Sequence, residues 1–176
     1  RENLGEPMRH VYRAIHDIVD GLSDVEVVFP VHRNPKVREI VQEELGHLPR
    51  VHLIDPLDYE PFANLMARVD IVLTDSGGIQ EEAPALGKPV LVLRDTTERP
   101  EAVAAGTVHL IGTAEEHVYN ETMRLLTDTG AYAAMAEAVN PYGDGRAAQR
   151  IIEAILYHAG HRHIPPEPFH AENEEY

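Results

Sequence analysis

Cysteine is absent from the 176-residue sequence, which excludes a disulfide framework, a thiolate nucleophile and a cysteine-ligated zinc site. No apolar run reaches the roughly 18 residues that a membrane-spanning helix needs. The first residues, beginning at Arg1, contain no apolar core of the kind found in signal peptides. We therefore expect a cytoplasmic protein that does not enter a membrane.

Basic residues are scarce, since 15 Lys and Arg face 30 Asp and Glu and the formal net charge is -15. This surplus of negative charge argues against binding to nucleic acid or to an anionic membrane surface. It does not exclude a small anionic ligand, because a few local donors can override the overall field. Apolar residues make up 43% of the chain, enough for one globular domain with a real core.

Short β-branched runs alternate with segments of helical periodicity along the chain. We expect strands at 25–29, 51–54, 71–73, 90–93 and 108–111. We expect helices at 8–19, 37–45, 62–69, 81–86, after Pro100, from a capping box at 113–116, and at 145–157. This alternation predicts an α/β fold, with a parallel sheet covered by helices on both faces. In such sheets, ligands bind beyond the carboxyl ends of the strands.

The segment after the third expected strand is the best candidate for a binding site. Ser76, Gly77 and Gly78 follow an apolar run and open a helical pattern. Unpaired N–H groups, the helix dipole and the small size of glycine would together suit a phosphate. A tight turn also uses glycine, so the residues alone leave both interpretations open. Glu82 lies one turn into the helix, where it could accept from a sugar attached to the phosphate or be a solvated surface carboxylate.

Several ordered motifs together resemble one family. They are Pro-Val-His-x-Asn-Pro-x-Val-Arg-Glu at 30–39, Thr-Asp-Ser-Gly-Gly-Ile-Gln-Glu-Glu-Ala-Pro-x-Leu-Gly-Lys-Pro-Val at 74–90, Arg-Asp-Thr-Thr-Glu-Arg-Pro-Glu at 94–101, Ala-Gly-Thr at 105–107 and Asn-Pro-Tyr-Gly-Asp-Gly at 140–145. This set resembles the C-terminal half of the non-hydrolysing UDP-N-acetylglucosamine 2-epimerases, from Arg1 to about residue 157.

The resemblance implies half of a glycosyltransferase B architecture, in which the active site lies between two Rossmann-like domains. Residues 1–158 would be the C-terminal UDP-binding domain, and 159–176 a tail rich in His, Pro and Glu. The implied reaction interconverts UDP-GlcNAc and UDP-ManNAc by elimination and re-addition of UDP, without a cofactor. The resemblance also implies a homodimer that serves cell-envelope polysaccharide biosynthesis. A UDP-sugar glycosyltransferase of this fold and a non-catalytic UDP-sugar-binding module are the alternatives.

The resemblance also assigns roles to individual residues. Ser76, Gly77, Gly78 and Arg99 would hold the diphosphate, Glu82 would accept from the ribose hydroxyls, and Leu57 and Phe62 would contact uracil. Two of these residues have other interpretations. By pattern alone Phe62 is a core residue on the apolar face of its helix. Arg99 could form a surface salt bridge to Glu98 or Glu101, which would contribute little.

The histidines have less certain roles. His32 matches a residue that contacts a second, regulatory UDP-sugar in some bacterial members, or it is a loop histidine bonded to its neighbours. His158, His161 and His163 could be drawn as a metal site. The prolines that follow them predict an extended tail instead, and we predict no metal site.

The start of the chain departs from the family pattern. Only Arg1, Glu2 and Asn3 match a motif in which a catalytic histidine and a strand come first. The acidic residues expected to transfer protons would also precede Arg1. The missing strand would lie inside the sheet, where its absence exposes strand edges. We therefore expect the functional enzyme to be longer, and this chain alone to be inactive.

Overall fold

Short parallel strands form two separate sheets in the computed structural model, which describes residues 5–169. The residues of the Arg1–Asn3 motif and the acidic end of the tail lie outside the described residues. One sheet pairs β1 (Val27–Pro30) with β2 (Val51–Ile54), and Val27 lies opposite Val51. The other has the order β3 (Val72–Thr74), β4 (Val90–Val92) and β5 (Val108–Leu110).

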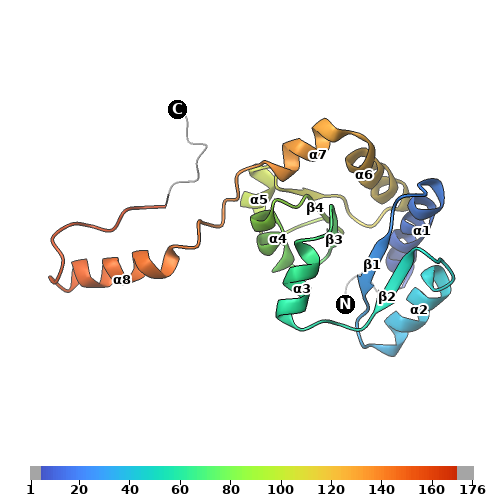
Figure 1. Cartoon of the computed structure of the whole chain (residues 1–176), viewed down its shortest axis with the longest axis horizontal. Helices are drawn as coiled ribbons and strands as arrows, with labels where there is room; N and C mark the ends of the chain where they lie inside the picture. The colour runs from blue at the N-terminus through green and yellow to red at the C-terminus, as the bar shows by residue number, and fades with distance from the viewer. Residues whose placement is uncertain (1–4, 170–176) are drawn as a thin grey trace.

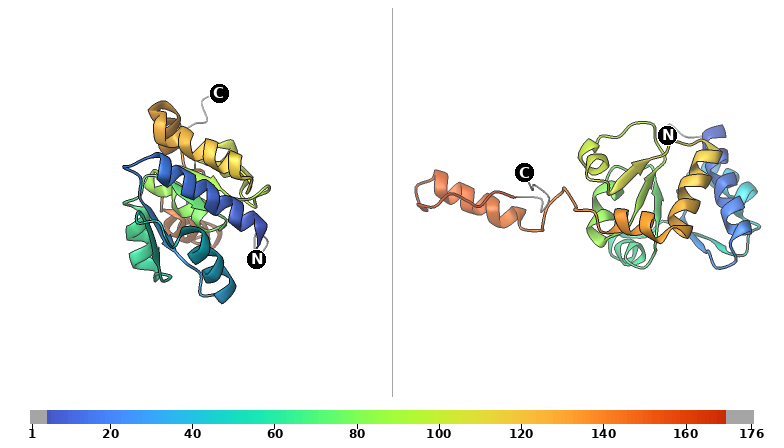
Figure 2. Two further views of the ribbon diagram at one scale, coloured as in Figure 1. Left: turned by 90° about the vertical axis from the view of Figure 1, so that its right-hand side faces the viewer. Right: turned by 90° about the horizontal axis from the view of Figure 1, so that it is seen from above.

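Helices cover both faces of these strands, as Figures 1 and 2 show, so the predicted α/β fold is confirmed. None of the helices within residues 5–169 is both long and apolar enough to cross a membrane. The helical elements are α1 (Glu6–Gly21), α2 (Pro35–Leu45), α3 (Tyr59–Met66), α4 (Ile79–Glu82), the 3-10 turn η1 (Pro84–Leu86), α5 (Pro100–Ala104), α6 (Glu115–Thr127), α7 (Thr129–Ala136) and α8 (Ala147–His158).

Two predictions about helices were wrong, and one helix was not predicted. The expected helix at 81–86 divides at Pro84 into α4 and η1, because proline cannot donate the hydrogen bond that would continue an α-helix. The expected capping box does not form, since Ala114 is the N-cap of α6 and no side chain caps it. Helix α7 was not predicted, because its apolar residues occupy all sides of the helix and leave no periodicity to detect.

The parallel strands of the described residues form two sheets, with unpaired strand edges between them. Within the described residues, β1 and β3 turn their outer edges toward each other without pairing. A mostly apolar cavity of about 920 Å³ lies between the edges, lined by Val27 and Phe29 on one side and by Ile71 and Leu73 on the other. We call this cavity the sheet gap. It is an inside position of the kind in which the strand expected to precede Arg1 would lie.

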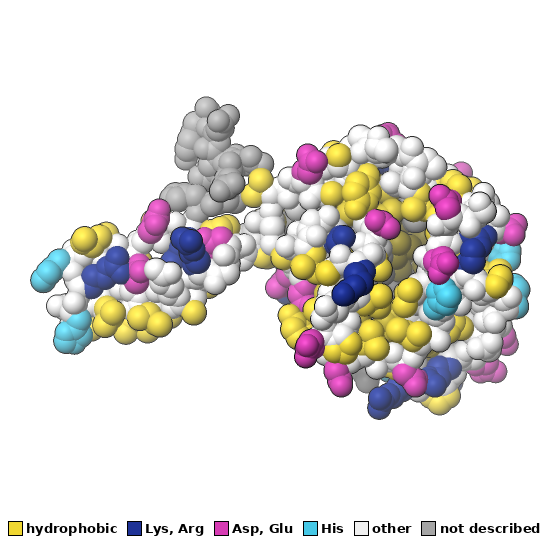
Figure 3. All heavy atoms as spheres, in the orientation of Figure 1, with side chains coloured by type: hydrophobic (Ala, Val, Ile, Leu, Met, Phe, Trp, Pro, Cys, Tyr) yellow, Lys and Arg dark blue, Asp and Glu magenta, His cyan; other side chains and the backbone are white. Residues whose placement is uncertain are grey.

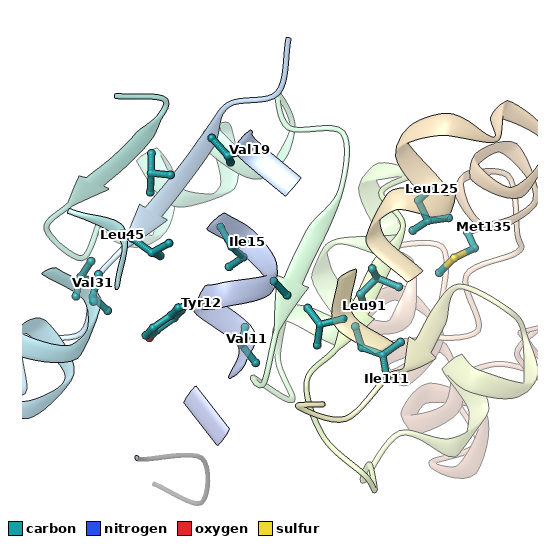
Figure 4. Close-up of a cluster of buried hydrophobic side chains, with 14 residues drawn as sticks. Val11, Tyr12, Ile15, Val19, Val31, Leu45, Leu91, Ile111, Leu125 and Met135 are labelled. Atoms are coloured by element: carbon teal, nitrogen blue, oxygen red, sulfur yellow. The ribbon is translucent and has the colours of Figure 1, made fainter. Parts of the chain in front are cut away.

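Helix α1 holds the two sheets together on one face. It packs against α2 beside the first sheet and against α6 beside the second. Figure 4 shows Val11 and Ile15 of α1 between Leu45 on one side and Leu91 and Leu125 on the other. One cluster of buried side chains therefore extends across both halves of the molecule.

Helix α8 lies apart from the rest of the chain (Figures 1 and 2) and contains no buried residue. Its apolar side chains are exposed to solvent, with Ile151 at 59% and Ile155 at 61% of their full accessible area. Figure 3 shows hydrophobic side chains along one side of this helix. Exposed apolar surface of this kind marks a region that another structure covers.

The N-cap of α7 supports a first prediction. The Asp128 carboxylate accepts from the backbone N–H groups of Gly130 (2.9 Å) and Ala131 (3.0 Å). Asp128→Ala should lower the free energy of unfolding by about 1 kcal/mol, because both donors lose their acceptor. Asp58, the N-cap of α3, makes no capping bond, so Asp58→Ala is the matched control. Urea denaturation that gave equal losses for the two variants would contradict this prediction.

Candidate functional site

Two neighbouring loops at one edge of the second sheet form the candidate site. Strands β3 and β4 are parallel, so the turn after Thr74 and the loop after Val92 emerge at the same edge. A hydrogen bond of 2.6 Å from Thr97 Oγ1 to Gln80 Oε1 joins the loop to the start of α4. Two of the loops that carry candidate ligand-binding residues are therefore brought together here.

The turn at 76–78 has free donors. The Ser76 N–H donates to Thr74 Oγ1 (3.0 Å), and the Ser76 carbonyl accepts from Gln80 Nε2 (3.2 Å). Within residues 5–169, the N–H groups of Gly77 and Gly78 and the Ser76 hydroxyl have no partner. Since α4 is only 4 residues long, these donors, and not the dipole of a long helix, are what the turn offers to an anion.

The chain itself does not require glycine at 77 or 78. Neither residue has a positive φ, and Gly78 has ordinary helical angles of φ -64° and ψ -39°. A Cβ atom would come no closer than 3.8 Å to another group at Gly77 and 3.9 Å at Gly78, which are ordinary contacts. Gly112 differs, because its φ is +61° and a Cβ would lie 2.8 Å from Asp95 Oδ1. The tight-turn interpretation therefore does not explain Gly77 and Gly78, whose Cβ positions are open and whose N–H groups have no partner within residues 5–169.

Arg99 is held at the rim of the site by three groups. Its Nε donates to the Glu81 carboxylate, its Nη1 donates to the Glu98 carbonyl (3.2 Å), and its backbone N–H donates to Thr97 Oγ1 (3.0 Å). The hydrogen bond that Arg99 donates to Glu81 raises the pKa of Arg99, so the guanidinium stays charged. Its ion pair is thus with Glu81, and not with the carboxylates of Glu98 or Glu101 that the sequence analysis considered.

The other candidate UDP contacts lie on elements that flank the turn. Glu82 folds back toward the turn, since its Oε1 lies 3.9 Å from the position that a Cβ on Gly78 would take. Phe62 of α3 is half-buried and packs against the same buried cluster as Ile79 of α4. Leu57, in the loop between β2 and α3, is 38% exposed.

The candidate histidines are not part of this arrangement. His32 lies in the loop after β1, in the first sheet, and its Nδ1 accepts from the backbone N–H of Asn34 at 3.1 Å. His158, His161 and His163 lie in and after α8. Among residues 5–169, no group of three or more His, Asp or Glu side chains could hold a metal ion.

Sequence reasoning missed three polar residues around the turn. Gln80 is fully buried and Thr97 is half-buried, and they connect the turn to the loop of Arg99. The spacing of Gln80, four residues after Ser76, was the available signal, because it places the two on one side of a helix start. Tyr142 packs on the second buried cluster, where its hydroxyl finds no hydrogen-bond partner among residues 5–169, and burial raises its pKa to about 12.

A family model described as UDP-N-acetylglucosamine 2-epimerase matches residues 1–156. The chain belongs to this family. It is 56% identical to the UDP-N-acetylglucosamine 2-epimerase of Bacillus subtilis (strain 168) over 169 residues. The aligned region covers 96% of this chain and 44% of that relative. The chain thus spans less than half the length of that epimerase.

Solved structures of the epimerase family have the same fold. The S. aureus MnaA–UDP co-structure matches with a TM-score of 0.91 and 48% identity, over 97% of this chain and 47% of that one. The UDP-GlcNAc 2-epimerase from Neisseria meningitidis bound to UDP-GlcNAc matches with a TM-score of 0.84 and 48% identity, over 89% of this chain and 42% of that one. This chain therefore has the fold of one half of a glycosyltransferase B-like epimerase.

Proposed function

We propose that this chain binds the UDP of a UDP-N-acetylhexosamine at the 76–78 turn. The observation that carries the proposal is the pair Gly77 and Gly78, whose N–H groups are free and whose lack of side chains serves no need of the chain itself. The charged guanidinium of Arg99 lies on the neighbouring loop. Similar proteins bind UDP and UDP-GlcNAc, which supports a diphosphate as the anion.

Each site residue has a proposed contact. With its Nε bonded to Glu81, Arg99 can turn its remaining N–H groups to two phosphate oxygens. Ser76 donates its hydroxyl to the diphosphate, and Glu82 accepts from the ribose hydroxyls. Phe62 and Leu57 lie against uracil, and Leu57 contributes only packing or backbone groups there.

We propose that the longer protein is a UDP-GlcNAc 2-epimerase. A carboxylate outside this chain removes the C2 proton while the C1–O bond breaks and UDP leaves with the bonding electrons. The unsaturated sugar regains a proton at C2 on its other face, and UDP adds back to C1. The contribution of this chain is to stabilise the negative charge that develops on the departing β-phosphate, through the turn and Arg99.

A further region of the longer protein would complete the structure in two places. One strand of that region would fill the sheet gap and pair with both β1 and β3. Another part would cover the exposed apolar face of α8. The S. aureus structure supports this proposal. Its match covers 97% of this chain, which is too extensive to omit α8. This chain covers only 47% of the S. aureus chain, so that protein has a further region that could cover such a helix. We propose residues 1–158 as the UDP-binding domain and 159–176 as its tail.

Two further features belong to the proposal. His32 would contact a second, regulatory UDP-sugar through Nε2, since Nδ1 is bonded to Asn34. The longer enzyme would be a cytoplasmic homodimer that serves cell-envelope polysaccharide synthesis.

Isothermal titration with UDP tests the proposed site. Ser76→Ala and Glu82→Ala should each weaken binding by about tenfold, because each removes one polar contact to the ligand. Ser23, in the turn between α1 and β1, and Glu39, in α2, are exposed residues of the same types, so Ser23→Ala and Glu39→Ala are matched controls. Absence of UDP binding by the unaltered chain, with a folded circular dichroism spectrum, would refute the proposed site.

A further inference from the structure

Gln80 is a polar residue with 0% exposure directly beneath the candidate site. Both ends of its amide are engaged, since Nε2 donates to the Ser76 carbonyl (3.2 Å) and Oε1 accepts from Thr97 Oγ1 (2.6 Å). The orientation of the amide follows from these partners, because a carbonyl oxygen can only accept. A buried polar group with both ends paired is strongly fixed in place.

The bond to Ser76 determines where the anion donor points. The C=O and N–H of a trans peptide point in opposite directions. Gln80 holds the Ser76 carbonyl toward the interior, and the N–H of the same peptide, which belongs to Gly77, therefore faces outward. Without this hydrogen bond the peptide could rotate, and the Ser76 carbonyl could then face an incoming phosphate.

The bond to Thr97 extends the same connection to the arginine. The Thr97 hydroxyl donates to Gln80 and accepts from the backbone N–H of Arg99 (3.0 Å). One chain of hydrogen bonds thus runs from the Ser76–Gly77 peptide through Gln80 and Thr97 to Arg99. It fixes the distance between the two groups that would hold opposite sides of a diphosphate.

We infer that Gln80 and Thr97 are positioning residues, which orient the Gly77 N–H and the Arg99 backbone toward one diphosphate without touching it. This inference rests on the proposed binding of UDP. Gln80 and Thr97 would orient groups that bind the phosphates, and no group that binds the nucleoside. Removal of their hydrogen bonds should therefore weaken UDP binding and leave uridine binding unchanged.

Thr97→Val tests the inference, because it keeps the shape of the side chain and removes both hydrogen bonds. We expect the affinity for UDP by isothermal titration to fall by about tenfold, as for the loss of a buried hydrogen bond. The affinity for uridine, measured by saturation-transfer NMR, should not change. Thr97→Ser should restore UDP binding. The matched control is Thr122→Val, since Thr122 is 6% exposed and no described residue is a hydrogen-bond partner of its hydroxyl.

Gln80→Glu provides a second test, since a carboxylate cannot donate to the Ser76 carbonyl and should also weaken UDP binding selectively. If a variant bound UDP and uridine more weakly by the same factor, Gln80 and Thr97 would have only a structural role, and the inference would be overturned. Unchanged UDP binding in folded Thr97→Val and Gln80→Glu proteins would also overturn it. Titration of the unaltered chain with UDP tests the proposed function separately. If that chain bound no UDP, the proposed function itself would fail, whatever the variants did.

Discussion

Replacing Gly77 and Gly78 together by alanine is expected to lower the affinity for UDP by about a hundredfold, which corresponds to roughly 2.7 kcal/mol. We expect the two added methyl groups, which would occupy the open space beside Gly77 and Gly78, to hinder a phosphate from approaching the N–H groups. The fold should tolerate both, because no positive φ is involved and the nearest contacts are 3.8 and 3.9 Å. Isothermal titration measures the affinity, and thermal denaturation measures the stability.

The stability of this double variant separates a binding role from a structural one. Alanine at ordinary φ angles lowers the entropy of the unfolded chain, so stability should be unchanged or rise by about 0.5 kcal/mol. Gly112→Ala is the matched control, because its φ of +61° and the approach of Asp95 should make it destabilising. A double variant that unfolds, or one that binds UDP as well as the unaltered chain, would show that the glycines do not serve an approaching phosphate.

The second large effect is expected when this chain is joined to the preceding region of the B. subtilis relative. The 176-residue chain alone should not epimerise UDP-GlcNAc, because the proton-transfer residues are proposed to lie elsewhere. The joined protein should form UDP-ManNAc at a rate measurable by proton NMR. In D₂O the product should carry deuterium at C2, since elimination exchanges that proton with solvent. The sheet gap and the face of α8 should also be filled, which would raise the melting temperature.

The outcomes of this experiment distinguish the functions that share this fold. UDP binding without turnover in the joined protein would favour a non-catalytic UDP-sugar-binding module. Transfer of the sugar to an acceptor would favour a glycosyltransferase. Epimerisation by the isolated chain would contradict the proposal that the catalytic residues lie outside it. The Gly77→Ala/Gly78→Ala double variant of the joined protein should lose turnover, because UDP is both leaving group and returning nucleophile.

The strands and most helices could be predicted because their signals are local. The strand predicted at 51–54 has the predicted bounds, and the other strands differ by one or two residues at one or both ends. Buried parallel strands read as short apolar runs whatever their neighbours are. The errors came where local signals conflict or vanish. Pro84 divides a helix whose periodicity continues through it, and α7 is apolar on all sides.

The candidate site could be located from sequence but not understood from it. Ser76, Gly77 and Gly78 stand out after a strand, and the family motifs add Arg99 and Glu82. The pairing of Arg99 with Glu81 could not be read from the chain, because Glu98 and Glu101 are nearer in sequence. Nor could the link from Gln80 to Thr97, which are seventeen residues apart and meet only because β3 and β4 are neighbours.

By itself, the sequence determined the α/β class, the order of strands and most helices, the family and the turn that is the candidate site, since each depends on residues that are close together in the chain. Only the tertiary structure decided that the strands divide into two sheets around a gap, and that α8 stands exposed. It also decided that the two glycines are not needed for the turn. The physical reason is that φ angles, close approaches and strand partners depend on atoms brought together by folding, which no local pattern of residue types specifies.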